Sequence, residues 1–401
     1  MSEPKTTSNQ SARSIDVNSL RLALLFPTVE LGTYWQPVLS KLAEITRQVV
    51  LYTGRPWAGF DPKDPTTATV EVVGETVRVT TNLDKTDYGG GYMKLSTKIV
   101  GRLLRFKPQV IIACGFSIWT ILALLSKPIG HWRVIIAWDG SSPNVDFRHS
   151  KLRLLLRRSI AYFADGFITN TEAGKSYFCE FLSINRNQIV VRPYLVPDPE
   201  TLLGGAASMV PASLAAVTPV FLYVGRIEER KGIHLLLQSC NILHKEGHKF
   251  SLLIIGRGPQ RDELEDYCHS QNLHDCVKWL GWVDYHQLGG YFRLADVLVF
   301  PSLEDIWGMV APEAMAFGKP VLCSKWAGSS ELIAHGKSGF ICDPHSPTEM
   351  AAMMRQSIES PELISAMGKA AQDTMAQHTP EAVAQFLAEL SLQTLNRSRF
   401  R

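Results

Sequence analysis

The feature that most constrains the fold of this chain is a repeated alternation between short, almost wholly apolar runs and longer amphipathic ones. Runs such as 21–27, 108–114 and 133–138 consist mainly of Val, Ile, Leu and Ala. Apolar runs of this length are typical of parallel strands that helices cover on both faces, and the stretches between them have helical spacing. The sequence therefore predicts an α/β fold built from parallel sheets.

The alternation is interrupted once, over 196–219, where prolines and glycines gather among small residues as they do in a linker. It then restarts with apolar runs at 220–224, 250–255, 277–280, 297–300 and 321–324. A chain of 401 residues also exceeds the length at which one core stops growing, which is roughly 250 to 300 residues. We therefore expect two doubly wound, Rossmann-like domains that face each other across a cleft.

The predicted organisation has five parts. They are a disordered tail at 1–18, an N-terminal Rossmann-like domain at 19–195, a linker at 196–218, a C-terminal Rossmann-like domain at 219–375, and a final helical segment at 376–401 that is expected to pack back on the N-terminal domain. Within the first domain, a turn at Gly74 and Glu75 favours a hairpin over 70–81, and a helix is expected over 92–106.

Composition narrows the class of protein. The chain is 45% hydrophobic and 20% charged with a mean hydropathy of zero, which excludes a largely disordered chain and a polytopic membrane protein. Seven cysteines without a Cys-x-x-Cys pair favour reduced thiols. The first 19 residues are polar and lack the apolar core of a signal peptide. We expect a cytoplasmic protein.

The net charge of +3 conceals an asymmetry between the two halves. Residues 1–195 carry 24 Lys and Arg against 15 Asp and Glu, or +9, and the remainder carries 17 against 23, or −6. The positive excess gathers in two acid-free stretches, 92–107 and 148–158. Their cations are Lys94, Lys98, Arg102, Arg105 and Lys107 in the first, and Arg148, Lys151, Arg153, Arg157 and Arg158 in the second.

Leucines interleave with these cations, so each stretch is predicted to be a basic amphipathic surface. One interpretation is peripheral contact with an anionic membrane, on its inner face. The other is an ordinary solvated helix face. Nucleic acid is not an expected partner, because no binding motif accompanies the charge.

The most informative segment is 302–320, which follows an apolar strand and leads through Gly308 into a helix that begins near Met309. Backbone N–H groups at such a helix start can bind hydroxyl or phosphate oxygens. Asp305 on the loop and Glu313 about one turn inside the helix can both face one ligand, and carboxylates accept hydrogen bonds from vicinal sugar hydroxyls. The alternative for Glu313 is an acid on a helix surface.

Two further strand ends carry candidate binding residues. Arg226 and Lys231 follow the strand at 220–224 and can converge on a diphosphate, although ion pairs with Glu228 and Glu229 are the alternative. The strand at 250–255 ends in a turn whose glycines would let the backbone approach a flat base closely. That turn comprises Gly256, Arg257, Gly258 and Pro259.

Together these motifs resemble the retaining family 4 glycosyltransferases of the GT-B fold, known as glycosyl transferases group 1. The resemblance covers about residues 220–345. It rests on Gly225, Arg226, Lys231 and Gly232, on the turn at 256–259, on 281–283, on 305–308 with Glu313 and Gly318, and on Gly328 to Glu331 and Gly336 to Gly339.

The resemblance implies a fold, a reaction and a set of roles, in which the domain at 19–195 binds the acceptor and the domain at 219–375 binds the nucleotide sugar. Arg226 and Lys231, beside Gly225, would bind the donor diphosphate, and Glu313 the ribose. Asp305 would hold the transferred sugar, together with backbone N–H groups of Trp307, Gly308 and Met309. Gly256, Gly258, Pro259 and Trp282 would flank the base.

It also implies hexosyl transfer from a nucleotide-diphosphate sugar to a lipid-linked or saccharide acceptor, in polysaccharide, glycolipid or lipopolysaccharide synthesis. Neither a metal nor an organic cofactor is implied.

The chain departs from the family pattern in three places. Asp305 stands where the family has Glu, a single Gly32 stands where it has a glycine pair, and Asp139 follows the strand at 133–138 where a His often occurs. Asp139 is the candidate base or acceptor-positioning acid in the N-terminal domain, with a turn-forming role as the alternative. The first two departures keep a second hypothesis open, a catalytically silent scaffold or sensor that binds a nucleotide sugar.

Overall fold

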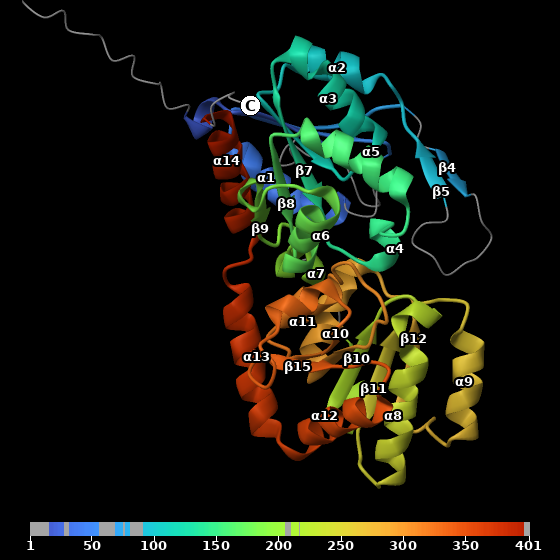
Figure 1. Ribbon diagram of the computed structural model, residues 1–401. Helices are drawn as coiled ribbons and strands as arrows, with labels where there is room; N and C mark the ends of the chain where they lie inside the picture. The colour runs from blue at the N-terminus through green and yellow to red at the C-terminus, as the bar shows by residue number, and fades with distance from the viewer. Residues whose placement is uncertain are drawn as a thin grey trace, which may run out of the picture.

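The computed structural model describes residues 16–27, 32–55, 69–74, 77–80, 91–204, 210–215 and 217–396. Two parallel sheets with helices on both faces form two Rossmann-like domains, placed one above the other in Figure 1. The predicted fold class is therefore confirmed.

The N-terminal domain is built on a seven-stranded parallel sheet in the order β3-β2-β1-β6-β7-β8-β9. The strands are β1 (Arg21–Leu25), β2 (Gln48–Thr53), β3 (Thr69–Val72), β6 (Val110–Cys114), β7 (Arg133–Trp138), β8 (Gly166–Thr169) and β9 (Ile189–Val191). The helices are α1 (Gly32–Ile45), α2 (Ile99–Phe106), α3 (Ile118–Gly130), α4 (Pro143–Asp146), α5 (Lys151–Tyr162) and α6 (Glu172–Leu182).

Burial on both faces explains the continuous apolar runs. Successive side chains of a strand point to opposite faces of the sheet. In β1, Leu22 and Leu24 pack into one core, whereas Ala23 and Leu25 pack into the core on the other face. The buried positions of such a strand are apolar on both faces, which is why the central strands could be predicted from their composition.

The C-terminal domain repeats the design with a six-stranded parallel sheet in the order β12-β11-β10-β13-β14-β15. The strands are β10 (Val220–Val224), β11 (Ser251–Ile255), β12 (Val277–Gly281), β13 (Val297–Phe300), β14 (Val321–Ser324) and β15 (Gly339–Cys342). The helices are α8 (Ile233–Lys245), α9 (Arg261–Ser270), α10 (Leu288–Leu294), α11 (Val310–Ala316), α12 (Pro347–Glu359) and α13 (Pro361–Met375).

The chain crosses between the domains twice. It passes from the first domain to the second through α7 (Pro199–Leu203), and it returns after α13 into α14 (Pro380–Asn396), which lies beside α1 in Figure 1. Val383 and Leu387 of α14 are buried in the same core as Trp35 and Leu39 of α1. Helix α14 is thus part of the N-terminal core, although it follows the whole second domain in the sequence.

Three local expectations differ from the structure. β3 joins the edge of the large sheet, and the hairpin forms instead from β4 (Val77–Thr80) and β5 (Gly91–Lys94), which pair antiparallel. Helix α2 begins only at Ile99, and the first residues of the predicted helix, 92–94, belong to β5 instead. Residues 17–19 form a 3-10 turn capped by Asp16, so 16–18 belong to the fold, while 1–15 of the predicted tail lie outside the described residues.

All seven cysteines are free, and Cys240, Cys268, Cys323 and Cys342 are buried. Among the helices of the described residues, none combines the length and the apolar character that crossing a bilayer requires.

Candidate functional site

The candidate residues of the second domain lie in loops that follow the carboxyl ends of β10, β11, β12 and β13. In open α/β sheets this edge is where ligands bind. The loop after β13 meets the N-terminal domain directly. A Cβ atom added to Gly140 would lie 1.9 Å from the carbonyl oxygen of Ile306, and Asn144 of α4 donates a hydrogen bond to Glu304 over 2.7 Å. The candidate site therefore lies at the interface between the two domains.

Lys231 and Asp305 form an ion pair at this edge. The Lys231 Nζ atom lies 2.5 Å from Asp305 Oδ2, and only 12% and 9% of the two side chains are exposed. Gly232 permits the arrangement because its φ is +69° and an added Cβ atom would lie 2.1 Å from the Pro301 carbonyl oxygen. The turn after β10 is thereby held against the loop after β13, with its positive charge neutralised by Asp305.

Arg226 is placed differently from Lys231. Its side chain is 70% exposed and pairs with Glu228 over 2.8 Å, and Glu228 also pairs with Arg230 over 2.7 Å. The ion-pair alternative thus describes Arg226, whereas Lys231 pairs with Asp305 and not with the neighbouring glutamates. An exposed arginine held by one surface contact can swing toward an incoming phosphate at little cost.

Glu313 lies in α11 and is buried, with 3% of its surface exposed. The Tyr285 hydroxyl donates a hydrogen bond to its carboxylate over 3.1 Å, and Tyr34 of α1, in the other domain, is a second hydrogen-bond partner. Burial raises the pKa of Glu313 to about 7, and the two tyrosine hydrogen bonds act against this shift. The alternative of an acid on a helix surface is wrong for this residue.

Tyr34 and Tyr285 were not among the predicted site residues. Their rings meet edge to face with centroids 5.7 Å apart, so they bring α1 of the first domain onto Glu313 of the second. Nothing in their local sequence marks them, since they are joined only by the tertiary fold. The available signal was the position of Tyr34 in the sequence, two residues after Gly32, which stands where the resembling family has a glycine pair. Helix α1 begins at Gly32, and 28–31 lie outside the described residues.

Trp307 anchors the loop between Asp305 and α11 in the opposite domain. Its side chain is 3% exposed and packs in the N-terminal core, where its indole N–H donates to the Leu195 carbonyl over 3.2 Å. Gly308 follows with a φ of +84°, and an added Cβ atom would lie 2.4 Å from the Phe300 ring. Met309 packs against the same N-terminal core. The loop is fixed from both domains, so the predicted backbone donors sit on a rigid support.

The turns after β10 and β11 press against each other. A Cβ atom on Gly256 would lie 1.8 Å from the Gly225 carbonyl oxygen, and one on Gly258 would lie 2.0 Å from that of Ile227. Glycine is therefore required at both positions for backbone packing, before any ligand is considered. Trp282, after β12, is 62% exposed and offers a flat surface on which a base could stack.

Asp139 lies at the end of β7, next to the glycine that contacts Ile306. Tyr194 donates a hydrogen bond to its carboxylate over 2.7 Å, and the Asn170 amide donates to its backbone carbonyl over 2.9 Å. Burial raises the pKa of Asp139. An acid with a raised pKa thus lies beside the domain interface. It directly precedes Gly140, which lies against Ile306 in the loop that contains Asp305.

A second contact between the domains involves Glu331, which belongs to the motif 328–331. Its carboxylate accepts hydrogen bonds from the backbone N–H groups of Glu172 and Ala173 over 2.7 and 3.1 Å. These groups are at the first turn of α6, where the helix dipole favours a negative charge. Glu331 caps a helix of the other domain, a role that its motif did not predict.

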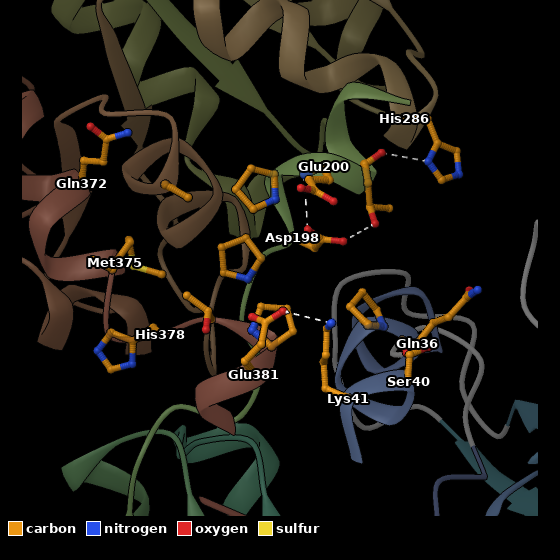
Figure 2. A pocket seen from close by; sticks show the side chains of 18 of the residues that line it. Gln36, Ser40, Lys41, Asp198, Glu200, His286, Gln372, Met375, His378 and Glu381 are labelled. Carbon is orange, nitrogen blue, oxygen red and sulfur yellow. Dashed lines mark hydrogen bonds and ion pairs between the residues drawn. The ribbon is translucent and has the colours of Figure 1, made fainter. Parts of the chain in front are cut away.

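A cavity also lies elsewhere in the molecule. Its volume is about 1000 Å³, and it opens between the segments where the chain crosses from one domain to the other. Figure 2 shows Lys41 paired with Glu381 across it, with Asp198, Glu200 and His286 nearby. None of the predicted site residues lines this cavity. Within the described residues, no group of three or more His, Cys, Asp or Glu side chains is arranged to hold a metal ion.

The two facing Rossmann-like domains define the GT-B class of fold, and solved structures support this. The chain resembles the Anabaena protein HepE, crystallised with UDP, with a TM-score of 0.72 and 19% identity over 92% of this chain and 98% of that one. At this identity the likeness shows the fold alone.

Sequence comparison finds a known protein family that matches part of the chain. Residues 212–374 match the family Glycosyl transferases group 1. An uncharacterized glycosyltransferase of Methanocaldococcus jannaschii is 39% identical over 33% of this chain and 34% of its own length. The D-inositol 3-phosphate glycosyltransferase of Streptomyces avermitilis is 30% identical over 55% of this chain and 50% of its own. The chain thus spans a third to a half of these two relatives.

Proposed function

We propose that the chain is a glycosyltransferase that moves a sugar from a nucleotide-diphosphate sugar to a hydroxyl acceptor, with retention of configuration. The observation that carries this proposal is the placement of Lys231, Asp305 and Glu313 in loops and a helix at one sheet edge, against the loop that contains Asp139. The family match over 212–374 covers the first three of these residues. The structures of HepE with UDP and with UDP-glucose support a uridine nucleotide as the first donor to test.

Lys231 and Arg226 would neutralise the donor diphosphate and the charge that develops on it as it leaves. Fixed cations near a developing charge stabilise the transition state without reorganisation, and their removal typically lowers the rate by about 10²- to 10³-fold. The proposed role needs no metal ion or organic cofactor, because the two side chains supply the positive charge themselves. When the diphosphate takes over Lys231, Asp305 becomes available to accept a hydrogen bond from a sugar hydroxyl.

The transfer breaks the bond between the anomeric carbon and the phosphate oxygen, whose electron pair leaves with the diphosphate. The acceptor oxygen forms its bond on the same face of the sugar, and its proton passes to the departing phosphate oxygen. Asp139 would position the acceptor hydroxyl, and Glu313 would accept hydrogen bonds from the ribose hydroxyls. The acceptor would be lipid-linked or a saccharide, as polysaccharide, glycolipid or lipopolysaccharide synthesis requires, and the transferred sugar a hexose.

A thermal-shift panel of nucleoside diphosphates and their sugars tests the donor, followed by an assay for diphosphate release. Ligand at 100 times its dissociation constant stabilises a protein by about 2.7 kcal/mol, which is readily measured. We expect a uridine diphosphate sugar to stabilise the chain and to be hydrolysed slowly or transferred. A chain that no nucleoside diphosphate stabilises would contradict the proposal.

The second candidate function is a catalytically silent scaffold or sensor. Two observations favour it: Asp305 stands where the resembling family has Glu, and protein side chains already occupy both acids, through Lys231 and the two tyrosines. This candidate predicts stabilisation by the donor with no release of diphosphate, even in the presence of hydroxyl acceptors. The same two measurements therefore separate the candidates.

A further inference from the structure

The N-terminal domain concentrates exposed apolar side chains on two helices. Of the twelve exposed large hydrophobic residues in the described part of the chain, eight lie on α3, on α5 or directly after α5. They are Ile118, Leu125, Ile129, Leu152, Leu155, Leu156, Tyr162 and Phe163. Single exposed apolar residues are normal on a monomer, whereas a group of them marks an interaction site.

The two helices cover the same core, so their exposed residues lie on the same outer side of the domain. Both pack inward on the same core, α3 through Trp119 and α5 through Ile160, and Figure 1 shows them on the same side of the sheet. The Lys127 ammonium of α3 donates a hydrogen bond to the Phe163 carbonyl over 3.0 Å, which joins their ends. The leucines at 152, 155 and 156 have the spacing of one helix face. We call this surface the α3–α5 face.

The helices that carry and border the α3–α5 face present cations, although Arg102 pairs with Glu71 over 3.5 Å and Glu180 of α6 is also exposed. Helices α2, α3 and α5 contain no Asp or Glu. Exposed cations border the leucines on α5 and continue on and around α2, and they are Lys98, Arg102, Arg105, Lys107, Lys151, Arg153 and Arg158. Lys94, which was predicted to share a helix with the first group, lies in β5 instead.

Arg157 and Arg148 were predicted to lie on the basic surface, but they face inward and are not part of the α3–α5 face. The Arg157 guanidinium lies 5.3 Å from the Phe116 ring and 5.0 Å from the Trp138 ring, and it donates to Tyr177 over 2.7 Å. Arg148 pairs with the buried Asp146 over 2.9 Å. The stretch 148–158 therefore contributes fewer surface cations than predicted, and apolar side chains make up a larger share of the surface.

We propose that the α3–α5 face docks on an anionic phospholipid bilayer. Helices that lie on a membrane bury an apolar face about 5 to 10 Å deep at the boundary between headgroups and acyl chains, with Lys and Arg at the headgroups. This face supplies both components. A second copy of the chain fits worse, because a symmetric dimer would set the same basic surface against itself. Charge complementarity thus selects the bilayer.

The docking surface is close to the domain interface. Helix α5 follows α4, whose Asn144 contacts Glu304 in the loop of the candidate site. A bilayer on the α3–α5 face would therefore lie near the loop that contains Asp139. This consequence for the acceptor rests on the proposed function, whereas the binding of vesicles does not.

Vesicle sedimentation with the full chain tests the proposal. The vesicles contain phosphatidylcholine alone or with about one-third phosphatidylglycerol, at low and high salt. Since each Lys or Arg near an anionic surface contributes about 1 kcal/mol, we expect binding to the anionic vesicles to be at least about tenfold stronger and to weaken with salt. Equal binding to both kinds of vesicle would overturn the proposal.

Two sets of variants separate local contact from net charge. The triple variant Leu152→Ser, Leu155→Ser and Leu156→Ser should bind anionic vesicles at least tenfold more weakly, with an unchanged melting temperature, because all three side chains are exposed. Lys151→Glu with Arg153→Glu should lose binding, whereas Lys245→Glu with Lys249→Glu, the same charge change on the other domain, should retain it.

Retained binding in the triple variant would overturn the proposal. So would a wild-type dimer that the triple variant lacks, found together with no vesicle binding. Hydrolysis of a soluble donor should be equal in all these variants, so failure of the docking proposal is distinguishable from failure of the proposed function.

Discussion

The ammonium of Lys231 lies 2.5 Å from the carboxylate of Asp305, and both side chains are largely shielded from water. The other Asp305 oxygen accepts a hydrogen bond from the Trp307 backbone N–H over 3.4 Å. The pair links the turn after β10 to the loop that reaches the other domain. A diphosphate that binds Lys231 must compete with Asp305. Donor binding is therefore coupled to the release of the Asp305 carboxylate from its ion pair with Lys231.

Replacement of Lys231 should affect both stability and turnover. Lys231→Ala leaves the shielded Asp305 charge uncompensated, and removal of one partner of a buried pair typically destabilises a protein by about 3 to 5 kcal/mol. We expect Lys231→Ala with Asp305→Asn to regain most of that stability in chemical denaturation but to stay about 10² to 10³ times slower in diphosphate release. The exposed Lys245→Ala is the control. Recovery of turnover in the double variant would remove Lys231 from the mechanism.

Glu313 should make stability depend on pH. Its pKa is raised to about 7 in the folded chain, against the ordinary value of 4.5. The folded state therefore holds a proton that the unfolded state has lost, and stability should fall as pH rises from about 4.5 to 7 and then stay low. The difference in pKa corresponds to about 3 kcal/mol. Glu313→Gln should abolish this part of the pH dependence in denaturant titrations, and an unchanged slope would contradict the assignment.

The same residue should make donor binding depend on pH in the opposite sense. Ribose hydroxyls donate hydrogen bonds to the ionised carboxylate and so favour it. Donor affinity should therefore rise as pH increases through about 7, measured by calorimetry in matched buffers. Tyr34→Phe removes a hydrogen bond that favours the ionised carboxylate, so the rise in donor affinity should move to higher pH in this variant. A pH-independent affinity would separate Glu313 from the ribose.

Glu331 should hold the domains together through α6. Loss of its two hydrogen bonds to backbone N–H groups leaves the helix start without its charged cap, which we expect to weaken the interface by about 1 to 3 kcal/mol. Glu331→Ala should speed proteolysis between the domains and raise the radius of gyration in small-angle scattering. Glu172→Ala is a matched control at the same helix start, because its side chain is 58% exposed. Identical proteolysis of both variants would reject this role.

Trp307 should be the most sensitive single position of the loop. Truncation of a buried Trp to Ala typically destabilises by about 3 to 5 kcal/mol. Trp307→Phe keeps the packing but loses the hydrogen bond to Leu195, so its effect should be smaller, about 1 kcal/mol. Trp326→Ala, at a side chain that is 52% exposed, should change the free energy of unfolding by less than about 0.5 kcal/mol. Equal effects of Trp307→Ala and Trp326→Ala would show that the loop is not anchored.

The strands and the strand-end motifs could be predicted from the sequence because their causes are local. A strand covered on both faces must be apolar throughout, and glycines such as Gly232 and Gly256 occupy positions where a Cβ atom would collide with backbone. The hairpin of β4 and β5 was misplaced because both of its strands are short and partly polar, so alternation does not distinguish them from turns.

The partners of the candidate residues could not be predicted, because they come from distant parts of the chain. Lys231 lies beside neighbouring glutamates in the sequence but pairs with Asp305, 74 positions away. Glu313 is contacted by Tyr34 from the other domain, and Arg157 turns from the surface into a group of aromatic rings. Each of these contacts is decided by the docking of whole elements.

The position of α14 has a consequence for synthesis of the protein. Leu387 completes a core whose other members include Leu22 and Leu24, at the opposite end of the sequence. The N-terminal domain therefore cannot close its core until α14 has been made, whereas the second domain has all its strands earlier. The N-terminal sheet is thus open to chaperones and to proteolysis until α14 has been made, and a chain truncated before 380 would lose the fold of the domain farthest from the cut.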